Sequence, residues 1–230
     1  MKGKTWQGMA AAGLLLAGGV AQAALVPYTV NGVDVVVDTD YTPVGATSPG
    51  LMWTKNANLA ASMNFGVSGI NANGSMTWAK ALEWIAAMNT ASYAGFSDWR
   101  LWSALNSDGS GPCGPGFNCN DSELGHLFYV EGGLSQNQAI TSSTALTAVF
   151  TNMQDSVYWS GTEYAPNPLN AWNFFTDDGF QYPDNKFNQY YGWAVRPGQV
   201  AAAPLPGTAL LMALGFGAMA VSHRARRRLW

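Results

Sequence analysis

The uneven distribution of basic, acidic and apolar residues along the chain restricts a folded domain to its middle. Two lysines precede an apolar run from Met9 to Val20, and four arginines follow a second apolar run from Gly207 to Val221. Setting both ends aside leaves Ala24 to Gln199, roughly 175 residues, which is enough for one domain with a hydrophobic core.

The middle segment is acidic and rich in aromatic residues. All 14 acidic residues of the chain lie there with only five basic ones, so its net charge is −9. It also holds 26 of the 29 Phe, Trp and Tyr residues, which predicts a core built from rings rather than aliphatic side chains. Nucleic acids and anionic lipid surfaces attract clustered Lys and Arg. We therefore expect no nucleic-acid partner.

Residues 1–23 have the pattern of a secretory signal peptide. A basic start and an apolar run lead to the small residues Ala21 and Ala23, which mark a cleavage site. Cleavage by signal peptidase would leave Ala24 as the N-terminus. An N-terminal membrane anchor is the alternative, but an apolar run of about a dozen residues is shorter than the roughly 20 that span a bilayer.

Residues 200–230 form a tail with three parts in a fixed order. The central part is an apolar run whose length is only marginally sufficient to span a membrane. A short motif lies on each side of this run. The positive-inside rule places the basic end in the cytoplasm and the middle segment outside. The flanking motifs are Pro204 and Pro206 on one side, and Arg224, Arg226, Arg227 and Arg228 on the other.

This tail resembles the PEP-CTERM sorting signal of Gram-negative bacteria, which exosortases recognise and process. Leu205 stands where that signal carries Glu. The resemblance implies export across the inner membrane, a membrane-anchored precursor held there transiently by a transmembrane sorting segment, and a final place at the cell surface or outside the cell. A plain single-pass anchor is the alternative.

Turn residues and apolar runs predict several short strands. Asn31-Gly32 between two apolar stretches indicates a β-hairpin, so residues 24–49 are expected to form an N-terminal hairpin. Asp178-Gly179 is a second hairpin-type turn. The remaining strands are expected at residues 51–53, 157–160, 171–175, 180–182 and 192–195.

Two helices are expected between these strands. One begins after the cap Ser75 and ends near Asn89, and a second runs from the cap Asp121 to Gly132. Helices early and an antiparallel set of strands late predict a single α+β domain with long loops. The apolar faces of the helices are expected to consist of Trp78, Ala81, Leu82, Ile85 and Met88 in the first, and Leu124, Leu127 and Phe128 in the second.

Cys113 and Cys119 are the only cysteines of the chain, and they lie in one Gly- and Pro-rich loop. In an oxidising exported compartment such a pair is expected to form a disulfide. Closing so small a loop contributes roughly 2 to 3 kcal/mol on the chain-entropy model. The alternative is a metal site, but two thiols with His126 make an incomplete ligand set.

Several blocks in the middle segment resemble the Lcl C-terminal domain family, which occurs on bacterial surface and secreted proteins. The matching blocks extend over residues 50–199, and they include 50–55, 93–101, 158–164, 171–174 and 193–198, with Trp78, Ala81 and Trp84 of the first helix. The resemblance implies a compact domain with a C-type-lectin-like layout, an adhesive or glycan-binding role, and no established catalytic residues.

No motif in the sequence supports catalysis. The serine-hydrolase, zinc-protease and phosphate-loop spacings do not occur. His126 is the only histidine of the middle segment, and we interpret it as a surface or capped structural residue rather than a base. The alternative enzyme is a carboxylate-dependent glycoside hydrolase acting on matrix polysaccharide. Its candidate acids are Glu163, Asp177, Asp178 and Asp184.

The region between Trp159 and Trp193 combines aromatic rings with amides and carboxylates, as a sugar-binding surface requires. Trp159, Trp172 and Trp193 fall within expected strands, so they are assigned to the core. A calcium ion could bridge Asp177, Asp178 and Asp184. The glycan-binding candidates are Glu163, Tyr164, Asn173, Asp177, Asp178, Tyr182 and Asn188. The sequence thus predicts a non-catalytic binding or structural component of an exopolysaccharide-rich surface or biofilm.

Overall fold

The structure is a computed structural model that describes residues 24–198. The predicted signal peptide with its Ala21–Ala23 cleavage site and the predicted sorting tail at residues 200–230 lie outside the described residues. Within the described part, no helix has the length and apolar character needed to cross a membrane.

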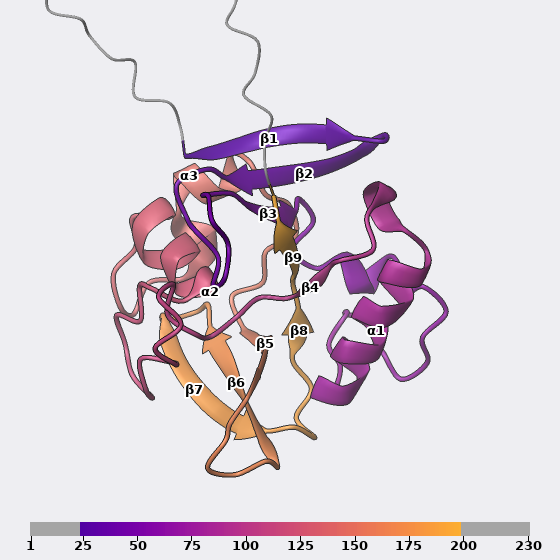
Figure 1. Cartoon of the computed structure of the whole chain (residues 1–230). Coiled ribbons are helices and arrows are strands. Elements are labelled where there is room, and N and C mark those ends of the chain that lie inside the picture. The colour runs from indigo at the N-terminus through magenta and orange to yellow at the C-terminus, as the bar shows by residue number, and fades with distance from the viewer. Residues whose placement is uncertain (1–23, 199–230) are drawn as a thin grey trace, which may run out of the picture.

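Two β-sheets and a few short helices make up the described residues, so the predicted α+β class is confirmed (Figure 1). The first sheet has the order β1 (Leu25–Val30), β2 (Val33–Asp38), β3 (Leu51–Thr54), β9 (Ala194–Pro197), β4 (Arg100–Leu101). The second has the order β7 (Phe180–Asn185), β6 (Asn170–Phe175), β5 (Val157–Glu163), β8 (Tyr191–Gly192).

The N-terminal hairpin forms at the predicted turn. Asn31 and Gly32 have φ values of 50° and 80°, the left-handed conformation that a two-residue turn of this kind requires. Strand β2 also pairs with β3, from Val35 opposite Thr54 to Asp38 opposite Leu51. The hairpin is therefore continuous with a sheet in which the C-terminal strand β9 lies between β3 and β4.

The prediction of a single last strand at residues 192–195 is wrong in two respects. It is divided at Trp193 into β8 and β9, which belong to different sheets, and β8 pairs with β5 in parallel. The cause is tertiary packing. The Trp193 indole is fully buried and donates a hydrogen bond to the Thr54 carbonyl at 2.9 Å. Its ring packs against the Trp53 ring, with the two centroids 5.0 Å apart.

Helix α1 (Trp78–Thr90) matches the first predicted helix, but its cap is Thr77 rather than Ser75. The Thr77 hydroxyl accepts a hydrogen bond from the Lys80 amide, whereas the Ser75 side chain bonds to Asn71 and Asn73. The buried face consists of Ala81, Trp84, Ile85 and Met88, while Leu82, expected on it, is 38% exposed.

The second predicted helix is α2 (Glu123–His126), which continues directly into a π-helical turn, η3 (Leu127–Glu131). Its cap is Ser122, because the predicted cap Asp121 accepts hydrogen bonds from Ser107 instead. Leu124, Leu127 and Phe128 are buried as predicted. Short helical segments that the sequence analysis did not predict are α3 (Thr144–Thr147), η1 (Leu59–Ala61), η2 (Tyr93–Gly95) and η4 (Ile140–Ser142).

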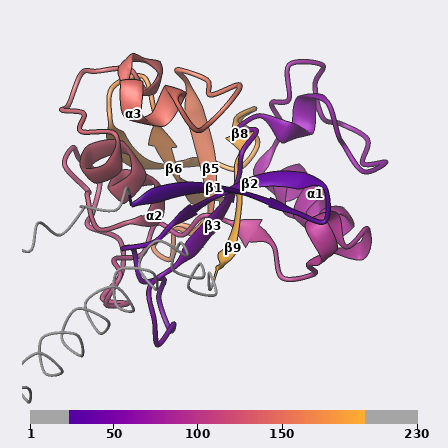
Figure 2. The ribbon, with the colours of Figure 1, turned by 90° about the horizontal axis from the view of Figure 1, so that it is seen from above.

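Tryptophan side chains fill two adjoining cores, and the expected burial of Trp159, Trp172 and Trp193 is confirmed. Seen from above, α2 and α3 lie toward one end of the hairpin and α1 toward the other (Figure 2). The first core runs from Leu25 to Val195 along the chain, so the described segment encloses its own hydrophobic interior. The tryptophans are Trp53, Trp102, Trp172 and Trp193 in the first core, and Trp84, Trp99 and Trp159 in the second.

Candidate functional site

The second sheet has two chemically different faces. On β6, Trp172 and Phe174 enter the first core. Residues directly opposite on neighbouring antiparallel strands share a face, so the other face carries the pairs Asn173–Tyr182, Phe175–Phe180 and Ala171–Asp184. We call this side, which points away from the first core, the far face.

Three aromatic rings form a ridge along β7 on the far face. Phe180 and Tyr182 stack with centroids 6.0 Å apart, and Phe117 meets Phe180 edge to face at 4.8 Å. Tyr182 is 42% exposed and Phe117 36%, although large rings are normally covered. We call Phe117, Phe180 and Tyr182 the aromatic ridge.

The disulfide loop places Phe117 in this ridge. The predicted disulfide between Cys113 and Cys119 is present. Inside the loop, Gly116 exchanges two backbone hydrogen bonds with Gln181 of β7, at 3.0 and 2.9 Å. The loop therefore pairs with the open edge of the sheet and holds the next residue, Phe117, against Phe180.

Polar side chains continue the far face beyond Tyr182. The Tyr190 hydroxyl donates to the Asp184 carboxylate at 2.5 Å and accepts from the Asn188 amide at 3.1 Å. Burial and the neighbouring Asp184 raise the pKa of the Tyr190 hydroxyl, which keeps it a donor. The Tyr190 ring packs against the Trp159 ring, with the two centroids 4.7 Å apart. We call Asp184, Asn188 and Tyr190 the polar end.

An ion pair lies next to the polar end. Lys186 contacts Glu163 at 2.5 Å, and its ammonium also lies 4.2 Å from the centroid of the Trp78 ring. Because the Glu163 side chain is half exposed, this pair contributes little to stability.

Of the sequence-predicted glycan residues, the structure gathers Glu163, Asn173, Tyr182 and Asn188 around the far face. Asn173 is fully buried beneath this surface, and neither polar atom of its amide has a hydrogen-bond partner among the described residues. Tyr164 is elsewhere, since it packs edge to face on Trp172 at 5.5 Å.

The predicted calcium ligands are not brought together. Asp177 and Asp178 lie in the turn before β7, where Asp178 accepts a hydrogen bond from the Phe180 amide at 2.8 Å. Asp184 lies toward the other end of β7, and four residues of extended strand span about 13 Å. The described residues hold one group of close metal-ligating side chains, and none of these three acids belongs to it.

A pocket of about 450 Å³ between α1, β4 and β5 is lined mostly by apolar residues. Its main charged groups are Arg100 and Glu123, which bond to each other through two contacts of 2.7 and 2.5 Å. Because this guanidinium and carboxylate already satisfy each other, the pocket offers few free polar groups for a hydroxyl-rich ligand.

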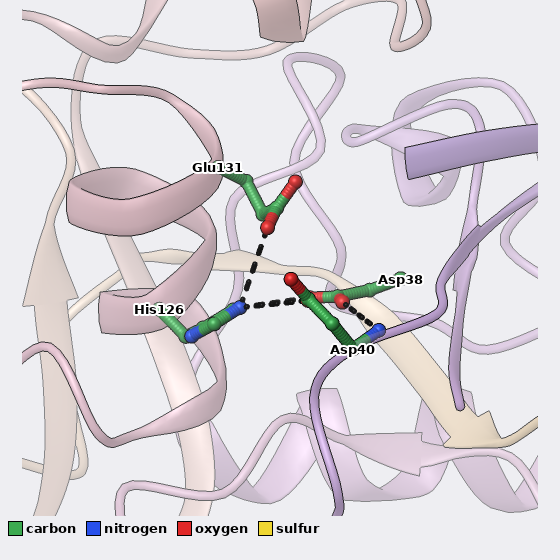
Figure 3. Close-up of side chains that lie close together, drawn as sticks. All are labelled: Asp38, Asp40, His126 and Glu131. Atoms are coloured by element: carbon green, nitrogen blue, oxygen red, sulfur yellow. Dashed lines mark hydrogen bonds and ion pairs between the residues drawn. The ribbon is translucent and has the colours of Figure 1, made fainter. Parts of the chain in front are cut away.

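The sequence analysis missed a cluster of four side chains near the N-terminal hairpin. Asp38, Asp40, His126 and Glu131 point toward one another (Figure 3). Burial raises the pKa of Asp38 to about 8 and that of Glu131 to about 7, and it lowers the pKa of His126. The spacing of these residues in the sequence did not indicate a cluster, because residues five apart, such as His126 and Glu131, do not share a face of an α-helix.

Comparisons of the chain with models of protein families, with curated proteins and with solved structures found no match.

Proposed function

We propose that this chain is an exported protein of the cell surface or extracellular matrix whose domain binds polysaccharide, without catalysis, through the far face of the second sheet. The observation that carries the proposal is the aromatic ridge, in which Phe117 and Tyr182 are exposed on either side of Phe180, and which is followed by the polar end. Sugar rings stack on aromatic faces, and their hydroxyls pair with carboxylates, amides and phenols.

The form of the far face favours a polymer over a small sugar. The ridge is a row of rings at an edge strand, and Asp184 of the polar end lies further along the same strand. Small ligands are usually bound in concave pockets that cover most of their surface. An extended row of contacts instead suits several consecutive sugar units of one chain.

Export and sorting are supported by the sequence of the two ends and by the disulfide, since disulfides persist in oxidising compartments outside the cytoplasm. On this proposal, signal peptidase and an exosortase process the chain, and its Lcl-like middle has a C-type-lectin-like layout. The matrix of the producing cell, an exopolysaccharide or biofilm, is the expected ligand.

A pull-down tests the binding proposal. Purified segment 24–198 is incubated with the producer's own polysaccharide, and retention is measured with and without calcium. We expect retention by the native segment, loss with Tyr182→Ala, and no loss with Tyr28→Ala, a tyrosine on β1 of the first sheet.

Sugar reducing ends are measured in the same tubes. Retention without release of reducing ends supports binding, whereas release that Glu163→Gln abolishes would favour the glycoside hydrolase alternative. Failure of the native segment to be retained in either condition would refute polysaccharide binding.

A further inference from the structure

Four side chains from separate segments converge on one point beside the N-terminal hairpin (Figure 3). Asp38 is the last residue of β2, and Asp40 follows it by two residues. His126 ends α2, and Glu131 ends η3. In this π-helical turn the Gly132 amide donates to the Leu127 carbonyl at 2.8 Å, five residues back. The wider turn brings residues five apart onto one face, and such turns are frequent at functional sites.

The three distances from His126 Nε2 are close to those between ligands of one ion, and all four ligand atoms lie within 4.8 Å of one another. From His126 Nε2, the carboxylate oxygens of Asp38, Asp40 and Glu131 lie at 3.6, 3.4 and 3.5 Å. These separations exceed the usual 2.7–3.2 Å of a hydrogen bond. Two ligands bound tetrahedrally at 2.0–2.1 Å from one ion lie about 3.3 Å apart.

Asp38 provides an independent indication of a ligand. Its side chain is fully buried, and its Oδ1 atom accepts a hydrogen bond from the Tyr41 amide at 3.1 Å. The Oδ2 atom is buried too, has no hydrogen-bond partner among the described residues, and faces His126. An unpaired buried carboxylate oxygen is costly, and a cation at the centre of the group would satisfy it. The backbone bonds to Oδ1 hold the carboxylate in place, as outer contacts of metal ligands do.

The charges of the group are also unbalanced. Three carboxylates surround one imidazole, and no Lys or Arg within residues 24–198 forms an ion pair with any of the four. A divalent ion would neutralise most of this negative charge.

The donor set discriminates between ions. Calcium and magnesium prefer oxygen ligands alone, in shells of six or more. Zinc takes imidazole nitrogen and carboxylate oxygen together in a four-coordinate shell. We propose that Asp38, Asp40, His126 and Glu131 bind one Zn²⁺ ion, which links the end of the N-terminal hairpin to the α2–η3 helical segment. This site is separate from the far face.

Titration of Zn²⁺ alone into EDTA-treated, dialysed segment 24–198 tests the site. We expect one ion per chain by calorimetry and a higher Tm, because a ligand that binds only the folded state stabilises it. Mg²⁺ and Ca²⁺ are expected to give neither. A chain that is folded by circular dichroism but binds no Zn²⁺ would overturn the proposal.

Variants separate this site from adventitious binding. Asp40→Asn changes a half-exposed carboxylate, so the variant should fold and bind Zn²⁺ at least about tenfold more weakly. His126→Gln should remove binding. Asp108→Asn, in an exposed loop, is the matched control and should bind as the native segment does. Equal binding by all three variants would show surface binding only and would contradict the proposal.

Discussion

At the scale of single residues, the Arg100–Glu123 pair is expected to be sensitive to substitution, because one of its charges is buried. The Glu123 side chain is 1% exposed, and its carboxylate accepts hydrogen bonds from Arg100 and from the Ser103 amide. Sequence patterns could not identify Glu123 as the partner of Arg100, because the two residues are distant in the sequence. Ion pairs between distant residues depend on how the segments pack in the fold, and local sequence patterns do not specify that packing.

Arg100→Ala is expected to lower the free energy of unfolding of segment 24–198 by about 3 kcal/mol, because it leaves a buried carboxylate uncompensated. Urea unfolding measures the change. Lys55→Ala is the matched control. Its partner Asp34 is half exposed, so a much smaller loss is expected. Equal losses in the two variants would contradict this assignment.

At the scale of elements, local sequence patterns correctly predicted those elements that local interactions stabilise. The hairpin turn at Asn31-Gly32 and the helix α1 were predicted, since turn residues and apolar spacing determine them. The division of the last strand at Trp193 was missed because the residues on its two sides pair with different sheets, which a local sequence pattern does not indicate. The π-helical turn of η3 was missed because no periodicity in the sequence distinguishes it from an α-helix.

The disulfide loop is the element that connects stability to the proposed site. Replacing both cysteines with serine should lower the free energy of unfolding by about 2 kcal/mol. It should also weaken polysaccharide retention, because the loop holds Phe117 against Phe180. Unfolding and pull-down experiments on the same preparation measure both effects. Undiminished retention despite the lost stability would show that Phe117 has no part in binding.

At the scale of the whole molecule, the separation of the chain into two basic ends and an acidic, aromatic middle predicted one domain, and the order of the expected helices and strands predicted its α+β class. The structure confirms that class, with two sheets around tryptophan cores. The candidate site was predicted only in part. Tyr182 and Asn188 are on the far face, but Phe117 joins the ridge through the disulfide loop, and Tyr164 does not belong to it.

Sorting of the whole chain is testable in the producing cell. Replacing the four C-terminal arginines with glutamine should leave unprocessed precursor in the membrane fraction, because an exosortase would no longer recognise the tail. Immunoblotting of membrane and extracellular fractions measures this. Normal processing and release of the variant would contradict the sorting proposal.

The binding affinity of the aromatic ridge for the producer's polysaccharide is the most direct test of the central claim. Calorimetry with size-defined fragments would compare the native segment 24–198, Tyr182→Ala and Tyr28→Ala. Loss of one stacking ring is worth about 1 kcal/mol, so Tyr182→Ala should raise Kd at least about fivefold while Tyr28→Ala leaves it unchanged. Equal Kd values for all three proteins, or no measurable binding by the native segment, would contradict the claim.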